Sequence, residues 1–125
     1  MAREKFQTLT EQMFYILLCL REECCGMDIM ERVRTVTGGR VTIGPGTLYN
    51  LLESFMTAGM IRETKVEGRK RSYILNDVGR QALKDEVARM NVLIGDYGKM
   101  IEQQYRCDGF VQRLSVEYCT RRNWG

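Results

Sequence analysis

The segment from residue 44 to residue 75 constrains the fold most, because its hydrophobic period changes there from that of a helix to that of two short strands. Gly44-Pro45-Gly46 is expected to start a helix, since a proline in the first turn has no intrahelical N–H partner to lose. The apolar stripe of this helix consists of Leu48, Leu51, Leu52 and Phe55, and Gly59 ends it. Strands over 61–66 and 72–75 are expected next, joined by a turn at 67–71.

Two amphipathic helices are expected before this segment. The helical spacing of Leu9, Met13, Ile16, Leu17 and Leu20 predicts a first helix from about Thr10 to Glu23. A second helix stops at Gly38-Gly39 and has one apolar face, formed by Ile29, Met30, Val33 and Val36. The β-branched stretch 40–43 is expected to form one small strand.

The turn between the two later strands carries the positive charge of the chain. Lys65, Arg69, Lys70 and Arg71 against Glu67 give 4 − 1 = +3, which equals the net charge of the whole sequence. A basic turn is usually a solvated loop, but this one follows a helix whose outer face has short side chains. That face consists of Gly46, Asn50, Glu53 and Thr57, flanked by Thr47 and Ser54, with Tyr49 at its margin, where it either faces outwards or packs against the hairpin.

The C-terminal third predicts a long helix with a partner. Asn76 is expected to cap it, with Asp77 in its first turn. Apolar residues then recur in steps of four and three at Leu83, Val87, Met90, Ile94, Tyr97 and Ile101. Such a seam indicates a coiled coil with a second copy of the chain, and the alternative is packing on the first helix of the same chain. We therefore expect two regions, a domain over 1–76 and a dimerisation helix with its tail over 77–125, including a short helix over 109–121.

Composition argues against several functions. The chain has no histidine, so the commonest general base and the triads built on it are missing, and no glycine-rich phosphate loop is present. The five cysteines show no C-x-x-C pair and the chain has no histidine, so we expect no metal. Without a histidine base or a phosphate loop, we also expect no cofactor and no enzyme. Without a signal peptide or a membrane span, we expect a cytoplasmic protein with reduced thiols. Redox sensing by Cys24 and Cys25 is the alternative to their being inert.

The order helix, helix, short strand, helix, strand, basic turn, strand predicts a winged helix-turn-helix: a mainly α fold with a small antiparallel β wing. The major groove of DNA admits one helix, and a hairpin beside it reaches phosphates or the minor groove. A helix N-terminus attracts phosphate, asparagine pairs with an adenine edge, and threonine contacts a phosphate or a thymine methyl. The third helix offers Thr47, Tyr49 and Asn50 in its first turns.

Four stretches resemble the PadR family of bacterial transcription regulators. They are Ile43-Gly44-Pro45-Gly46-Thr47-Leu48-Tyr49-Asn50-Leu51-Leu52, Ala58-Gly59-Met60-Ile61, Gly68-Arg69-Lys70-Arg71-Ser72-Tyr73 and Leu75-Asn76-Asp77-Val78-Gly79-Arg80. The resemblance implies a homodimer, usually a repressor, that binds double-stranded DNA. The residues predicted to contact DNA are Thr42, Pro45, Gly46, Thr47, Tyr49 and Asn50, with Lys65, Arg69, Lys70, Arg71 and Tyr73 in the wing.

The same resemblance implies an effector site. Some short members of the family bind flat aromatic molecules at the dimer centre with a tryptophan, and Met90 stands at the matching position here. Phe14, Met90 and Ile94 are therefore candidates for binding a small aromatic effector.

The chain also has Gly44 where the family often has serine, and Met27 where many members have tyrosine. The alternative function is a winged-helix module that binds protein and not DNA.

Overall fold

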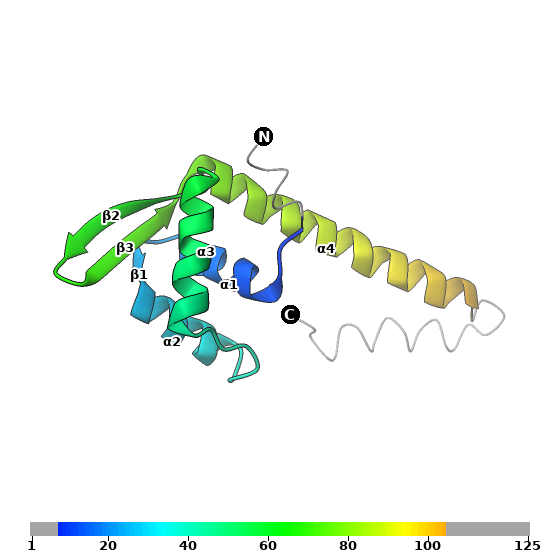
Figure 1. The fold of residues 1–125 in the computed structure, drawn as a ribbon. Coiled ribbons are helices and arrows are strands. Elements are labelled where there is room, and N and C mark those ends of the chain that lie inside the picture. The colour runs from blue at the N-terminus through cyan, green and yellow to red at the C-terminus, as the bar shows by residue number, and fades with distance from the viewer. Residues whose placement is uncertain (1–7, 105–125) are drawn as a thin grey trace. The chain divides into compact units, whose positions relative to one another are not determined.

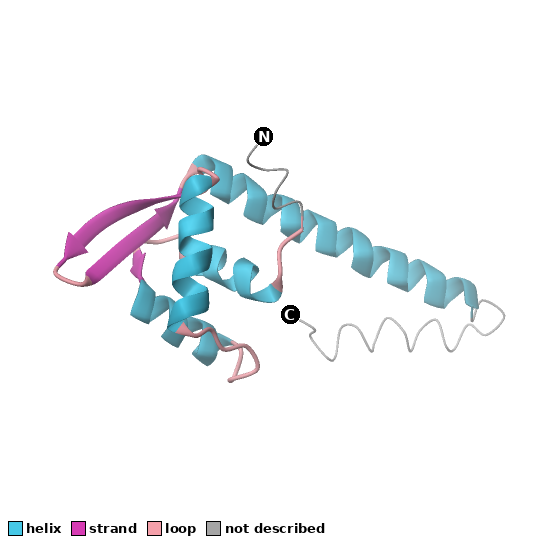
Figure 2. Ribbon diagram, viewed as in Figure 1, coloured by secondary structure: helices cyan, strands magenta, loops and turns pink. Residues whose placement is uncertain are grey.

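A computed structural model of the chain describes residues 8–104, with four helices and three strands in this part (Figure 1). In chain order they are α1 (Glu11–Cys19), β1 (Cys24–Cys25), α2 (Gly26–Val36), α3 (Pro45–Thr57), β2 (Ile61–Glu67), β3 (Lys70–Leu75) and α4 (Asp77–Gln104). Figure 2 shows how helical this part is, with β2 and β3 as the long strands. The predicted fold class, mainly α with a small antiparallel wing, is confirmed. The expected helix over 109–121 lies outside the described residues.

Helix α1 begins as expected and ends earlier. The Thr10 hydroxyl accepts a hydrogen bond from the Met13 N–H at 3.2 Å, which caps the first turn. The helix ends at Cys19 and not at Glu23. After it, the Leu20 carbonyl accepts from the Leu75 N–H at 2.9 Å, so the chain is turning towards β3 at that point. The spacing of apolar residues along the chain gives no indication of this long-range hydrogen bond.

The third strand of the sheet is not where the sequence indicated. The strand order is β1-β3-β2, with Cys24 opposite Tyr73 and Cys25 opposite Ser72. The predicted strand over 40–43 is wrong, because this segment pairs with no strand in the described structure. Its alternating pattern has another cause: Val41 and Ile43 are buried anchors of the loop before α3, and Thr42 between them is exposed.

Helix α3 crosses the core with its expected apolar stripe. Leu48, Leu52 and Phe55 are buried against α1 and α2 residues such as Ile16, Leu17 and Ile29. Gly44 is its N-cap and supplies no side-chain hydrogen bond to the first turn. Gly59 has a φ of 73°, a left-handed conformation that ends the helix at low cost for a glycine. The apolar face predicted for α2 is wrong at Val36, whose side chain is 71% exposed.

The first turns of α4 belong to the winged domain. Ala82, Leu83 and Glu86 are buried, and the first two are part of the core around Phe55. The chain divides into two compact units between Glu86 and Val87, whereas the sequence suggested a division after Asn76. The two units are therefore residues up to 86, with the winged helix-turn-helix, and residues from 87 on.

Candidate nucleic-acid interface

The first two turns of α3 present a compact polar surface. Pro45, Gly46, Thr47 and Asn50 are all exposed, and Thr42 is exposed in the loop that leads into the helix. Because Gly44 gives no side-chain cap, no side chain of the N-cap residue covers the backbone N–H groups of this turn. Uncapped N–H groups and the positive end of the helix dipole favour an anion such as a phosphate.

Tyr49 is half in and half out of this surface. Its side chain is 43% exposed, and its ring lies over Gly26, the first residue of α2. A Cβ added to Gly26 would lie 2.6 Å from the Tyr49 hydroxyl oxygen and 3.1 Å from its Cζ. Packing against α2 therefore fixes the ring, while its remaining surface faces solvent beside Asn50. The contact given for the ring is with α2 and not with the hairpin, and the other alternative, an outward-facing side chain, holds in part.

The hairpin β2–β3 extends away from the helices (Figure 1). The strands run further than expected, so the turn is only Gly68-Arg69, and Glu67 pairs with Lys70 beside it. Gly68 has a φ of 62°, as two-residue hairpin turns require. A bulge between Glu63 and Lys65 interrupts the register, and bulges increase the local twist.

The cations of the hairpin differ in their partners. Lys65 pairs with Glu67 at 3.2 Å, and Arg71 pairs with Glu63 at 3.6 Å. Among the described residues, Arg69 and Lys70 form no ion pair, and both are exposed at the tip. Exposed pairs contribute only about 0–1 kcal/mol, so all four cations are available to a polyanion, with Arg69 and Lys70 available at the least cost.

Tyr73 is not at the surface, so its prediction as a DNA contact is wrong. Tyr73 is 2% exposed because it belongs to the hydrophobic core cluster of the domain. Burial raises the pKa of the Tyr73 hydroxyl, and the neighbouring Glu63 adds to this effect. With so little exposed surface, Tyr73 is a structural side chain that a phosphate cannot reach.

Burial argues against redox sensing by Cys24, one of the two candidate cysteines. Both side chains are buried, and burial raises the pKa of the Cys24 thiol from its ordinary value of 9.0 to about 11. The thiolate is the reactive form, and the raised pKa keeps the Cys24 thiol protonated at pH 7. Cys24 and Cys25 are successive residues of β1, so their side chains point to opposite faces of the sheet. Cys24 is thus a poor redox sensor, and in the described part no cluster of His, Cys, Asp or Glu suits a metal ion.

The predicted dimerisation residues fall into two groups. Leu83 is 7% exposed in the core of its own domain, which leaves little of its surface for a partner. The others lie on α4 at positions 87 to 101, and Val87, Ile94 and Tyr97 are exposed. Of the effector candidates, Phe14 is half-buried against the domain core, whereas Met90 and Ile94 belong to the second unit. The seam and the effector site stay predictions.

The roles of two residues near α3 were not predicted from the sequence. Gly26 supports Tyr49, and Arg40 joins the loop before α3 to α1 through Glu11 at 2.6 Å. The signal for Arg40 was present, because a cation follows directly on the Gly38-Gly39 turn. Its partners are 25 and 29 residues away in the chain, so spacing gave no indication of them.

Comparison with solved structures shows the same fold in known regulators. A PadR family transcriptional regulator from Eggerthella lenta superimposes with a TM-score of 0.62 at 24% identity, covering 72% of this chain and 80% of that one. A PadR-like transcription factor from Bacteroides fragilis gives 0.62 at 22% identity, covering 70% and 87%. A transcriptional regulator from Clostridium thermocellum gives 0.61 at 18% identity, covering 73% and 92%.

No curated protein matches the sequence significantly. The model of the transcriptional regulator PadR-like family matches residues 16–85, which is more than half of the chain. The match begins in α1, includes α3 and the hairpin, and ends in the buried part of α4, so it covers the whole candidate interface. These relatives are described as transcription regulators and not as enzymes. In the described residues of this chain, no helix is long and apolar enough to cross a membrane. The chain belongs to the PadR-like family of transcriptional regulators.

Proposed function

We propose that this regulator is a homodimeric repressor that binds a roughly palindromic DNA operator and is released by a small aromatic effector. The observation that carries the proposal is the exposed first turn of α3, without a side-chain cap, beside a hairpin whose two tip cations form no ion pair with any described residue. The family membership supports DNA as the partner, and a regulator of transcription acts in the cytoplasm, where bacterial DNA is. Repression and effector release rest on the resemblance to the family.

The two parts of the interface have different roles in this proposal. Thr47, Tyr49 and Asn50 enter the major groove, where Asn50 pairs with an adenine edge and supplies sequence choice. Arg69 and Lys70 contact phosphates beside the groove, with Lys65 and Arg71 behind them, and supply salt-dependent affinity. The N–H groups at Gly46 and Thr47 bind one further phosphate.

The homodimer is supported by the apolar surface of α4. Val87, Ile94 and Tyr97 are exposed in the predicted seam, and Leu93 and Met100 extend the apolar side of the helix. A free helix with so much apolar surface is unfavourable in water, and a second copy of the helix covers it. Two-fold symmetry then places half-sites about 34–36 Å apart, or a multiple of that distance.

The test is a selection for binding sites from a random duplex library, followed by mobility shifts at two salt concentrations. We expect one enriched, roughly palindromic site, bound by one dimer and weakened by salt. A control duplex with the same composition and a scrambled order should bind far more weakly. Failure to enrich any sequence, together with no affinity for random duplex at low salt, would leave the protein-binding module as the function.

Single variants separate the two roles. Arg69→Ala and Lys70→Ala should weaken operator and scrambled duplex alike and lower the salt slope by about one each. Lys84→Ala, an equally simple loss of an exposed cation on α4, is the matched control and should leave the slope unchanged. Asn50→Ala should cost about 1–3 kcal/mol on the operator alone. Equal losses on both duplexes for Asn50→Ala would contradict its role in base recognition.

A further inference from the structure

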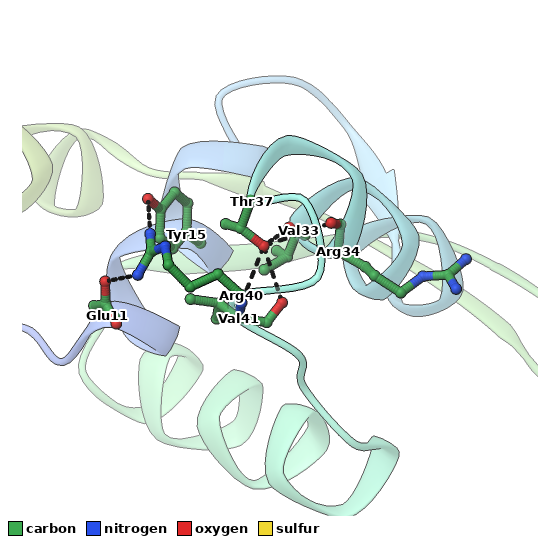
Figure 3. Close-up of polar contacts among 7 residues, drawn as sticks. All are labelled: Glu11, Tyr15, Val33, Arg34, Thr37, Arg40 and Val41. Carbon is green, nitrogen blue, oxygen red and sulfur yellow. Dashed lines mark hydrogen bonds and ion pairs between the residues drawn. The ribbon is translucent and has the colours of Figure 1, made fainter. Parts of the chain in front are cut away.

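We infer that Thr37 and Arg40 are positioning residues for the DNA-binding surface, because they fix the loop over residues 37–44 that carries the first turn of α3. This inference rests on the proposed function, since its readout is operator recognition. It concerns side chains outside the predicted interface, neither of which has to contact DNA. Figure 3 shows the two residues with their partners on α1 and at the end of α2.

The loop is anchored but not fully fixed by apolar packing. Val41 and Ile43 are each 6% exposed, so both side chains lie in the core. Between α2 and these anchors, Gly38 and Gly39 have φ values of 61° and 82°, which produce a tight reversal without side-chain support. Apolar burial is non-directional, so it sets the depth of the loop but leaves its lateral position to hydrogen bonds, which are directional.

The hydroxyl of Thr37 closes this reversal. It donates to the Val33 carbonyl at 2.7 Å, the shortest of the contacts open to its single hydrogen, and accepts from the Val41 N–H at 3.1 Å. Figure 3 shows the hydroxyl between the last turn of α2 and the chain at Val41. One side chain thus joins the end of α2 to the first buried anchor of the loop.

The guanidinium of Arg40 joins the same loop to α1. It donates to the Glu11 carboxylate at 2.6 Å and to the Tyr15 hydroxyl at 3.2 Å. Glu11 and Tyr15 are four residues apart and so lie on one face of α1, which suits the planar fork of an arginine. Gln12 adds a third link from its side-chain amide to the Thr42 carbonyl at 3.2 Å. Three side chains of α1 therefore hold the loop three to five residues before Pro45.

The test for Arg40 is a double-mutant cycle with Glu11, measured on the full chain with the selected operator and the scrambled duplex. The ratio of the two affinities is the readout, because changes of net charge act on both duplexes alike. We expect Arg40→Ala and Glu11→Ala each to lower the ratio by about threefold to tenfold, the effect of one lost hydrogen bond. The double variant should be no worse than Arg40→Ala alone, because that single variant already removes the bond to Glu11.

The ion pair between Arg34 and Glu31 provides a matched control. Its length is also 2.6 Å and its side chains are similarly exposed, but both residues lie on α2. Arg34→Ala and Glu31→Ala should leave the ratio unchanged. If Arg40 instead bound a phosphate directly, Glu11→Ala would tighten both duplexes, Arg40→Ala would weaken both, and the ratio would stay constant. That pattern, or an unchanged ratio in every variant, overturns the inference.

Thr37 is tested through its hydroxyl. Thr37→Val keeps the branched shape and removes the hydrogen bonds, whereas Thr37→Ser keeps them. We expect the valine variant to lower the affinity ratio by about threefold to tenfold and the serine variant to restore it, with circular dichroism confirming that both fold. Equal ratios for valine and serine would refute the role of the hydroxyl. If the wild-type chain selects no operator, the proposed function fails first and separately.

Discussion

Tyr49 and Gly26 show how a residue of one helix sets the surface of another. The Tyr49 ring rests on Gly26 because any side chain there would meet its hydroxyl at 2.6 Å. The φ of Gly26 is not left-handed, so the backbone accepts any residue and the glycine is required by space alone. At the same scale, Cys24 and Tyr73 are side chains whose chemistry is suppressed by burial.

Gly26→Ala is predicted to destabilise the domain and weaken operator binding. In a helical first turn alanine is normally better than glycine by up to about 1 kcal/mol. Here the added methyl overpacks Tyr49, and such overpacking costs about 1–3 kcal/mol. Thermal melting of Gly26→Ala, Tyr49→Phe and the double variant measures the coupling. Because phenylalanine lacks the hydroxyl, the double variant should recover part of the loss, whereas strictly additive effects would show that the contact does not matter.

The raised pKa of Cys24 predicts a loss of stability at high pH. The folded state holds the thiol proton up to a pKa of about 11, against 9.0 ordinarily, so the unfolded state loses its proton first as pH rises. The contribution of the protonated Cys24 thiol to the free energy of unfolding is complete below pH 9 and disappears between pH 9 and 11. Since Tyr73 acts in the same direction, the comparison is the melting temperature of wild type against Cys24→Ala. The difference should shrink towards pH 11, and a constant difference would contradict the assignment.

At the scale of elements, the start of α4 is docked on the turn that follows α3. The Met60 carbonyl accepts from the Asn76 N–H at 2.8 Å, and the Asn76 side-chain amide donates to the Gly59 carbonyl at 3.3 Å. One turn later Gly79 lies so close that an added Cβ would meet the Met60 carbonyl oxygen at 2.2 Å. The α3 turn and α4 therefore touch backbone to backbone, and the hairpin begins and ends at this junction.

Gly79→Ala is predicted to be strongly destabilising. The obstacle is a backbone oxygen, which cannot rotate away as a side chain would, so we expect at least the usual overpacking cost of about 1–3 kcal/mol. Gly95→Ala is the control, because α4 also contains Gly95 and no described residue lies within 4 Å of the added Cβ there. The control should be stabilised by up to about 1 kcal/mol. Denaturant unfolding of both variants distinguishes them, and a neutral Gly79→Ala would disprove the close docking.

At the scale of the whole molecule, the proposed function needs two copies. Each domain presents one α3, and α4 beyond Glu86 carries exposed apolar residues in the predicted seam. In the proposed dimer, pairing through that seam would join two DNA contacts into one stronger contact, because the second would then bind at a high effective concentration. Ala82 and Leu83, in the first turns of α4, lie in the domain core.

Ile94→Glu is predicted to dissociate the dimer. Val92→Glu is a closely matched control, because both wild-type side chains are 61% exposed and two residues of a helix lie about 200° apart around its axis. Sedimentation should give monomers for Ile94→Glu and dimers for Val92→Glu, with operator affinity reduced by about 100-fold or more only in the first. Two dimeric variants, or two monomeric ones, would contradict this assignment of the seam to one face of α4.

Features that depend on neighbours along the chain could be predicted from the sequence. Helical spacing, a proline in the first turn, glycines at turns and a cluster of cations are local signals, and they predicted α2, α3, the hairpin and the exposed residues Thr47, Asn50, Arg69 and Lys70. Its PadR resemblance is confirmed. Features that depend on distant partners became visible only in the folded chain. The two-residue strand β1 exists only because β3 pairs with it, and packing in the domain core buries Tyr73. Packing on the domain core buries Leu83, which local spacing could not distinguish from the seam. The link from Arg40 to Glu11 joins residues that only folding brings together, because a hydrogen bond requires proximity in space and leaves no period in the sequence.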